Sequence, residues 1–179
     1  METMTFKKIL KFWLPLAGTW LMMSVEGPFI AAIIARLVDP KFNLAAYGVA
    51  FSFALIVEAP VIMMMTASTS LVNDYTSLRK LRQYTWLLNA VITATMLILV
   101  IPDFFYFITI NLIGLPENVA QLTHTATIIM LPWPAAIGFR RFYQGVLIRN
   151  HSTRRVAYGT VIRLFSMGST ALLLYSYTT

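Results

Sequence analysis

Five ionisable side chains lie inside long apolar stretches of the sequence. They are Glu26, Glu58, Arg140, Arg141 and Arg163. An isolated charge at the centre of a bilayer costs about 2.5–3.5 kcal/mol on insertion scales, so such groups pair, lose their charge, reach the headgroups or face water. A carboxylate in this setting can bind a proton or a sodium ion, and a guanidinium group can bind a carboxylate or an anionic substrate. We therefore predict that the five residues line an ion or substrate pathway.

A structural role is the alternative interpretation of the arginines. Arg140 and Arg141 point about 100° apart on a helix, so both cannot face one neighbour, and a long side chain can extend its charge to the headgroups. The carboxylates of Glu26 and Glu58 lie about midway along their apolar segments and are too deep for this. We predict that Glu26 exchanges a proton in the functional cycle unless an arginine holds it ionised. We also predict that Arg140 or Arg141 lies near Glu58.

Glycine and proline residues near the two acids predict interruptions of the helices. A proline removes one backbone donor and frees the carbonyl four residues earlier. Broken helices beside acids recur at the ion and substrate sites of transporters. The predicted helix-breaking residues are Gly27, Pro28, Pro60, Pro132 and Pro134. The first two directly follow Glu26, and the third lies two residues after Glu58.

The composition excludes several classes of protein. The chain has 179 residues, of which 58% are hydrophobic and only 12% are charged, and its mean hydropathy is +0.71. This composition is typical of a polytopic membrane protein. There is no cysteine, and we find no Ser/His/Asp set, phosphate loop or metal-ligand cluster. We therefore predict no catalytic residues, no metal site, no enzyme activity and no binding of nucleic acid.

The hydropathy pattern predicts an all-α membrane bundle that spans residues 1–179 as a single unit. About five apolar segments are close to the roughly 20 residues that cross a bilayer. The predicted helices cover residues 12–37, 44–71, 84–107, 119–148 and 156–177. Short connections predict that consecutive helices are antiparallel neighbours.

The distribution of lysine and arginine predicts the orientation. One set of loops contains Lys7, Lys8, Lys11, Arg79, Lys80, Arg82, Arg149, Arg154 and Arg155. The opposite loops contain only Arg36 and Lys41. Because positive charge favours the cytoplasmic side, nine against two predicts a multi-pass protein of the inner cell membrane with a cytoplasmic N-terminus.

Three stretches resemble the multidrug/oligosaccharidyl-lipid/polysaccharide flippase superfamily. They are "FWLPLAGTWLMMSVEGPFIAAIIARL", "LAAYGVAFSFALIVEAPVIMMM" and "LPWPAAIGFRRFYQGVLIRNHSTRRVAYGTVIRL". The branch that they resemble most is the MATE branch, and within it the progressive-ankylosis type, partly through the position of Gly145. The resemblance implies a twelve-helix carrier of two six-helix lobes that works by alternating access. This chain would then be an N-terminal lobe, half of a two-lobe carrier, and its partner would be a C-terminal lobe or a second chain.

Two functions are consistent with these features. The first is a secondary active transporter, or one lobe of it, that exports a small organic or anionic substrate. In this case a proton or sodium ion is the coupling ion, no other cofactor is needed, and the five charged residues take part in coupling or substrate binding. The alternative is a membrane assembly subunit that transports nothing and whose buried charges only hold helices together.

Overall fold

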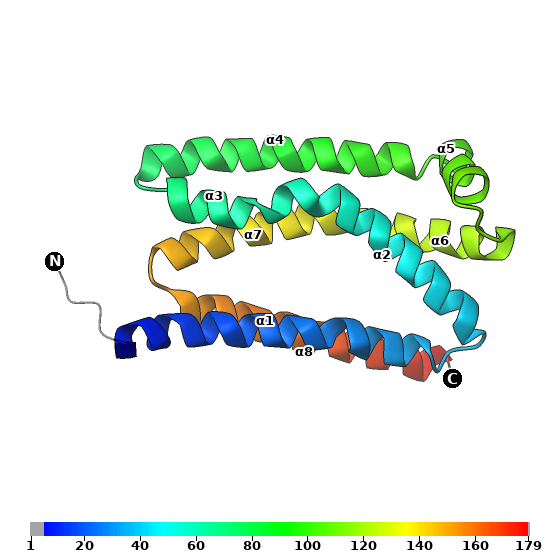
Figure 1. The fold of residues 1–179 in the computed structure, drawn as a ribbon, viewed down its shortest axis with the longest axis horizontal. Helices are drawn as coiled ribbons and strands as arrows, with labels where there is room; N and C mark the ends of the chain where they lie inside the picture. The colour runs from blue at the N-terminus through cyan, green and yellow to red at the C-terminus, as the bar shows by residue number, and fades with distance from the viewer. Residues whose placement is uncertain (1–5, 179) are drawn as a thin grey trace. The chain divides into compact units, whose positions relative to one another are not determined.

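The computed structural model describes residues 6–178, and its regular elements in this range are helices without any strand (Figure 1). The all-α prediction is therefore confirmed. The chain divides into two compact units: the first joins the N-terminal segment up to Val38 with the segment from Leu147 onward, and the second comprises Asp39–Val146. Below they are called unit 1 and unit 2.

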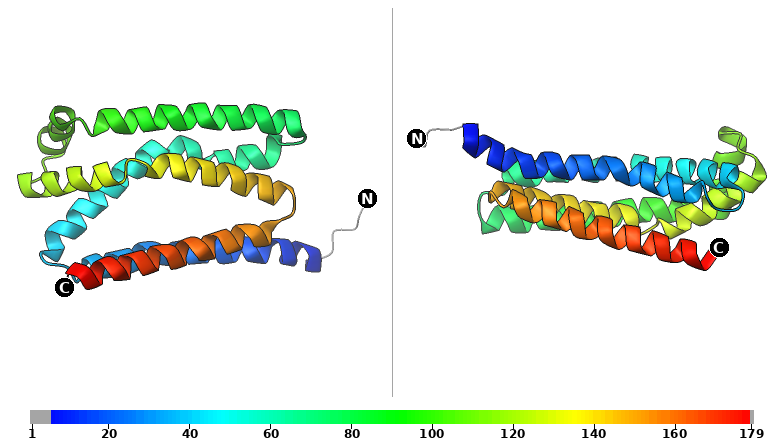
Figure 2. Two further views of the ribbon diagram at one scale, coloured as in Figure 1. Left: turned by 180° about the vertical axis from the view of Figure 1, so that it is seen from behind. Right: turned by 90° about the horizontal axis from the view of Figure 1, so that it is seen from below.

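Unit 1 is a pair of long helices, α1 (Phe6–Ile34) and α8 (Thr153–Thr178). They lie side by side along their length, as all three views show (Figures 1 and 2). The predicted break at Gly27 and Pro28 is absent, because α1 continues through both residues. A proline removes a single hydrogen bond from a helix, and long membrane helices tolerate that loss.

Unit 2 is built from shorter helices and one π-helix. They are α2 (Pro40–Ile62), α3 (Met64–Leu71), α4 (Tyr75–Leu99), α5 (Pro102–Tyr106), the π-helix η1 (Phe107–Leu112), α6 (Glu117–Ile129) and α7 (Trp133–Arg149), of which the part up to Val146 belongs to this unit. Its apolar core consists of Val61, Met64, Ile92, Ile137 and Phe142. This core joins α2 and α3 to α4 and α7, and so it fixes the polar side chains between them.

Two of the predicted interruptions are present in unit 2. Helix α2 ends at Ile62, just after Pro60, and α3 begins at Met64. The predicted helix over residues 119–148 is divided into α6 and α7 next to Pro132 and Pro134. Both breaks follow from the backbone donors that proline lacks.

Helix α4 begins at Tyr75, earlier than the predicted start at Tyr84. Asp74 forms a capping box, in which its Oδ1 accepts a hydrogen bond from the Ser77 amide at 2.8 Å and the Ser77 hydroxyl oxygen accepts one from the Asp74 amide at 3.0 Å. The cap satisfies free amides at the helix start, so the helix extends over polar residues that hydropathy had assigned to a loop. The helix ends at Leu99, before Pro102, where the prediction had continued to residue 107.

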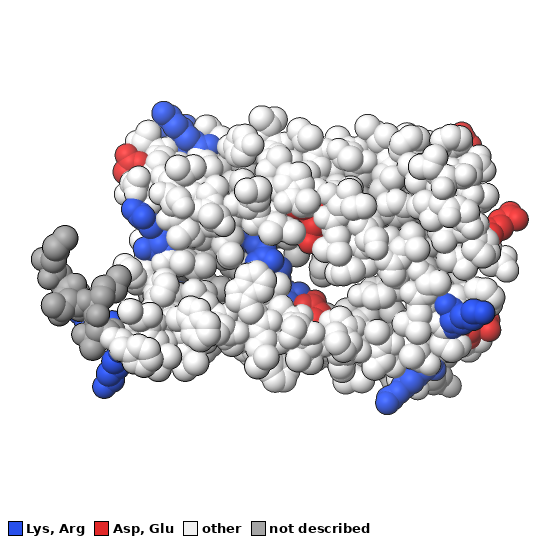
Figure 3. Space-filling view, in the orientation of Figure 1, with Lys and Arg blue, Asp and Glu red and all other residues white. Residues whose placement is uncertain are grey.

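The protein is a multi-pass membrane protein. The segments Phe6–Ile34, Pro40–Leu71 and Thr153–Tyr177 are long and apolar enough to cross a bilayer, and Tyr75–Leu99 together with Pro102–Leu112, bent by 76°, would make a fourth span. Most of the visible surface is uncharged (Figure 3). The predicted span over residues 119–148 is not found among the spans of the described residues. It is divided into α6, with 13 residues, and α7, with 17 residues, and each is shorter than the roughly 20 residues that cross a bilayer. By length and composition, the structure thus has three or four of the five predicted spans.

Candidate functional site

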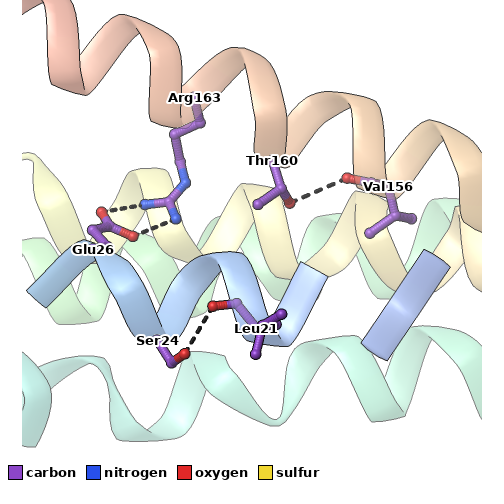
Figure 4. Close-up of polar contacts among 6 residues, drawn as sticks. All are labelled: Leu21, Ser24, Glu26, Val156, Thr160 and Arg163. Atoms are coloured by element: carbon purple, nitrogen blue, oxygen red, sulfur yellow. Dashed lines mark hydrogen bonds and ion pairs between the residues drawn. The ribbon is translucent and has the colours of Figure 1, made fainter. Parts of the chain in front are cut away.

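In unit 1, Glu26 and Arg163 form an ion pair between α1 and α8 (Figure 4). Arg163 Nη1 donates to Glu26 Oε1 at 2.6 Å, and Arg163 Nη2 donates to Glu26 Oε2 at 2.5 Å. Both carboxylate oxygens are therefore engaged by one guanidinium group, which is the strongest geometry for such a pair. The side chains are only 13% exposed for Glu26 and 23% exposed for Arg163.

The hydroxyl groups near this pair donate hydrogen bonds to backbone carbonyls of their own helices. The Ser24 hydroxyl donates to the Leu21 carbonyl at 2.7 Å, and the Thr160 hydroxyl donates to the Val156 carbonyl at 3.2 Å (Figure 4). These hydroxyls are satisfied within their own helices and donate no hydrogen bond to the ion pair.

In unit 2, Glu58 is almost completely buried, with 7% of its surface exposed. The indole N–H of Trp133 donates to Glu58 Oε2 at 3.1 Å. The guanidinium groups of Arg141 and Arg140 both act on this carboxylate electrostatically. Unit 2 thus brings together three residues that were predicted from the sequence and adds Trp133 to them.

Arg141 is buried in the same layer, with 8% of its surface exposed. Its Nη1 lies 4.0 Å from Met65 Sδ, a weak acceptor on α3. Glu58 and Met65 are seven residues apart, and Trp133 and Arg141 are eight apart, so each pair spans about two helical turns. The result is a polar strip between α2–α3 and α7, at a depth where apolar packing is otherwise the rule.

Glycine residues of α7 allow the neighbouring helices to approach closely. A side-chain carbon added to Gly138 would collide with the amide of Asn89 on α4, and one added to Gly145 would collide with Ser68 and with the Met65 carbonyl. Asn89 is 3% exposed, and neither its Oδ1 nor its Nδ2 has a hydrogen-bond partner in the structure. These contacts set how closely α7 packs against α3 and α4.

Sequence reasoning missed Trp133, Met65 and Asn89 as members of this layer. A signal existed for Trp133, which lies between two prolines and about two turns before Arg141. Asn89 is an amide in the apolar part of α4, where the other polar residues are threonines, and this also marks it as a candidate. Methionine at a buried position gives no signal, because it is a common core residue.

The structure holds no metal-binding cluster among the described residues. Within residues 6–178, no three His, Cys, Asp or Glu side chains are placed to share an ion. His124 Nε2 is 2.8 Å from the Val100 carbonyl oxygen, and its ring packs against Phe105 and Tyr106. The ring of His151 makes an edge contact with Phe12. Both histidines have structural contacts, and neither belongs to the acid–arginine pairs.

Comparison with known proteins identifies the family. The MatE family model matches residues 15–172, which include the buried acids and arginines of both units. No curated protein and no solved structure matches the chain. The match covers most of the sequence, and it confirms the MATE resemblance. The chain belongs to the MatE family of membrane transporters.

Proposed function

We propose that the chain is a lobe of a secondary active transporter that couples the movement of a proton or sodium ion to the export of a small organic or anionic substrate. The observation that supports this most directly is the two-point ion pair between Glu26 and Arg163 on two membrane-spanning helices. Such a pair has two states, closed and open, and only the open state exposes a carboxylate to a coupling ion.

The coupling step then follows from charge balance. A cation that binds Glu26 replaces the positive charge of Arg163, so the guanidinium group is released with an unsatisfied charge. An anionic group of the substrate satisfies that charge at low cost, because a planar guanidinium binds carboxylate and phosphate groups through two hydrogen bonds. Binding of the ion and binding of the substrate therefore favour the same open state, which is the thermodynamic requirement for coupling.

The polar strip of unit 2 supports a substrate pathway in the same carrier. Glu58 and Arg141 are buried. Glu58 precedes the interruption between α2 and α3, and Arg141 contacts Met65 just after it. An interrupted helix leaves free backbone carbonyls, which are tolerated at membrane depth where they meet protein or water. We propose that Glu58, Arg140 and Arg141 hold a polar group of the substrate.

The resemblance to two-lobe carriers leads to two further proposals. We propose that the chain works with a second lobe, supplied by the same or another polypeptide. We also propose that it lies in the inner cell membrane with its N-terminus in the cytoplasm, because nine lysine and arginine residues are on that side against two on the other.

One observation favours the structural alternative, a subunit whose charges only hold helices together. Glu26 and Arg163 satisfy each other through two hydrogen bonds, as a purely structural pair would. The two functions differ in what happens when the charges are exchanged. A structural ion pair holds the helices together whichever helix carries the acid. A coupling ion, in contrast, can bind only if the carboxylate stays on the helix that exposes it to the transport pathway.

The test is transport by the complete carrier in proteoliposomes. A gradient of protons or sodium ions is imposed, and a panel of organic anions and cations is screened for ion-driven movement. We expect ion-driven transport that is abolished by Glu26→Gln. Transport that is unchanged in this variant would contradict the proposal for Glu26, and the absence of any gradient-driven transport would contradict the proposed function.

A further inference from the structure

A basic pocket lies in unit 1, at the end of the helix pair where α1 begins. It has a volume of about 250 Å³ and is lined by Lys8, Lys11 and Phe12 from α1 and by His151, Thr153 and Arg154 from the start of α8 and the turn before it. Among the residues that the structure describes, the lining contains two lysines and one arginine and no acid. The transport site does not use any of these residues.

The floor of this pocket is a defined structure. The rings of Phe12 and His151 meet edge to face, with centroids 5.8 Å apart and planes at 66°. His151 has a left-handed backbone with φ of 54°, held in a turn by the hydrogen bonds from its amide to the Ile148 carbonyl at 3.0 Å and from the Ser152 amide to the Leu147 carbonyl at 2.8 Å. The turn therefore directs residues 151–154 back toward the beginning of α1.

We propose that this pocket binds a phosphate group, either that of an anionic lipid headgroup or that of a soluble phosphate compound. A phosphate has oxygens that accept hydrogen bonds on several sides, and it needs more than one cationic donor. Lys8, Lys11 and Arg154 supply three cations from two helices, and Thr153 adds a hydroxyl group. Phosphate binding at this pocket does not depend on the proposed transport activity.

The position of the pocket favours a lipid headgroup as the source. Helix α1 has 29 residues, whereas about 20 residues cross the hydrocarbon core, so its first turns extend into the headgroup region. Basic clusters next to a membrane helix attract anionic lipids by about 1 kcal/mol per charge, within a Debye length of the surface. The pocket differs from a general basic surface because its charges converge on one cavity.

Two neighbouring residues provide a matched control for this convergence. Lys7 and Arg155 are exposed, have the same charges as Lys8 and Arg154, and lie next to them in the sequence, but they do not line the pocket. A variant with Lys7→Gln and Arg155→Gln therefore loses the same two charges from the same end of unit 1 while it leaves the pocket intact.

The experiment is thermal unfolding of the purified chain in a non-ionic detergent, followed by tryptophan fluorescence. Phosphatidylglycerol is added in mixed micelles, with phosphatidylcholine as the lipid control, and inorganic phosphate is added in a second series against chloride at equal ionic strength. A ligand that binds only the folded state raises the midpoint temperature of unfolding, and the dependence of this temperature on ligand concentration gives the affinity. We expect phosphatidylglycerol to raise the unfolding midpoint of the wild type. In the double variant Lys8→Gln and Arg154→Gln, we expect the affinity for phosphatidylglycerol to fall by about tenfold or more, because two charged hydrogen-bond donors are lost.

The outcomes separate the sources and test the site. Stabilisation by phosphatidylglycerol alone identifies a lipid headgroup, and stabilisation by inorganic phosphate as well shows that the pocket accepts soluble phosphate. Equal weakening in the pocket variant and in the control variant would overturn the proposal, because net charge alone would then explain binding. The absence of stabilisation by both probes would also overturn it. If the double pocket variant does not fold, Lys8→Gln and Arg154→Gln are each compared with Lys7→Gln and Arg155→Gln in the same titrations.

Discussion

Glu26 and Arg163, which are 137 residues apart in the sequence, engage each other through two hydrogen bonds between α1 and α8. The pair joins the first and last helices that the structure describes. Its two partners depend on each other, because either one alone would leave a largely buried charge. This dependence makes the pair the centre of the predictions that follow.

The first prediction concerns the stability of unit 1. Glu26→Gln or Arg163→Gln strands one charge, which costs about 3–5 kcal/mol in buried pairs of soluble proteins. The double variant should lose less than the sum of the two single variants. The measurement is a double-mutant cycle on thermal unfolding in detergent, with Arg155→Gln on the same helix as the control for a lost surface charge. Additive losses would mean that the two residues do not interact in solution.

The second prediction compares the two arginines of unit 2. Arg141 is buried whereas Arg140 is only half-buried, and charges interact more strongly where water is excluded. The pair Glu58→Gln and Arg141→Gln should therefore show a larger coupling energy than the pair Glu58→Gln and Arg140→Gln. Trp133→Phe keeps the packing of the ring but removes the N–H that binds Glu58, so it should destabilise the wild type more than it destabilises the Glu58→Gln variant. A coupling with Arg140 that equals or exceeds the coupling with Arg141 would contradict this geometry.

The third prediction tests the close approach of α4 and α7. Gly138→Ala inserts a methyl group where the Asn89 amide lies, and overpacking of this kind costs about 1–3 kcal/mol. Asn89→Ala should restore much of the loss, because it removes the atoms that collide. Gly159→Ala is the control, since a side-chain carbon at this helical glycine meets nothing within 4 Å. If the Gly138→Ala variant is as stable as the wild type, α4 and α7 do not approach each other as closely as the structure shows.

The fourth prediction concerns the cap of α4 and its dependence on pH. The hydrogen bonds from the Ser77 side chain and amide are the main cause of a pKa of Asp74 below its ordinary value of 3.8. A carboxyl group whose pKa is lowered by folding stabilises the folded state. This stabilisation is fully present when the pH is above the ordinary pKa, and it is lost as the pH falls through the lower pKa of the folded state. The difference in unfolding temperature between the wild type and Asp74→Ala should therefore be constant from about pH 5 to 8 and should decrease below about pH 4. A difference that increases on acidification would contradict the assignment.

The fifth prediction concerns the orientation in the membrane. Reporter domains fused after Asn73, Gly114 and His151 should lie inside, outside and inside the cell, because the positive loops face the cytoplasm. The fusion after His151 is the most informative, since it also asks whether α6 and α7 together cross the bilayer. An external signal there would contradict the predicted crossing by residues 119–148.

Much of the fold follows from the sequence, because the length of an apolar segment limits what it can do in a bilayer. The helical class, the break after Pro60 and the division next to Pro132 were all predictable from local chemistry. The continuity of α1 through Pro28 was not, because a single proline interrupts some helices and only bends others. The early start of α4 was missed because hydropathy does not detect a capping box such as that of Asp74 and Ser77.

The pairing of the charged residues was less predictable than their presence. Glu26, Glu58 and the three arginines stand out because each is costly in an apolar segment. Which acid meets which arginine depends on the depth and rotation of helices that are far apart in the sequence. The proximity of Arg141 and Arg140 to Glu58 agrees with an argument from depth, whereas the contact of Glu26 with Arg163 requires α1 and α8 to be neighbours. The roles of these residues in coupling stay a prediction.

The most direct test of the central claim is to exchange the two charges of the pair. The complete carrier with Glu26→Arg and Arg163→Glu is reconstituted in proteoliposomes, and its ion-driven transport of a substrate first identified with the wild type is measured beside its unfolding temperature. The account predicts an unfolding temperature close to that of the wild type and no ion-driven transport, because the helices still pair but the carboxylate has left α1. Transport at the wild-type rate in a stably folded exchange variant would contradict it and would show that the pair only holds the helices together.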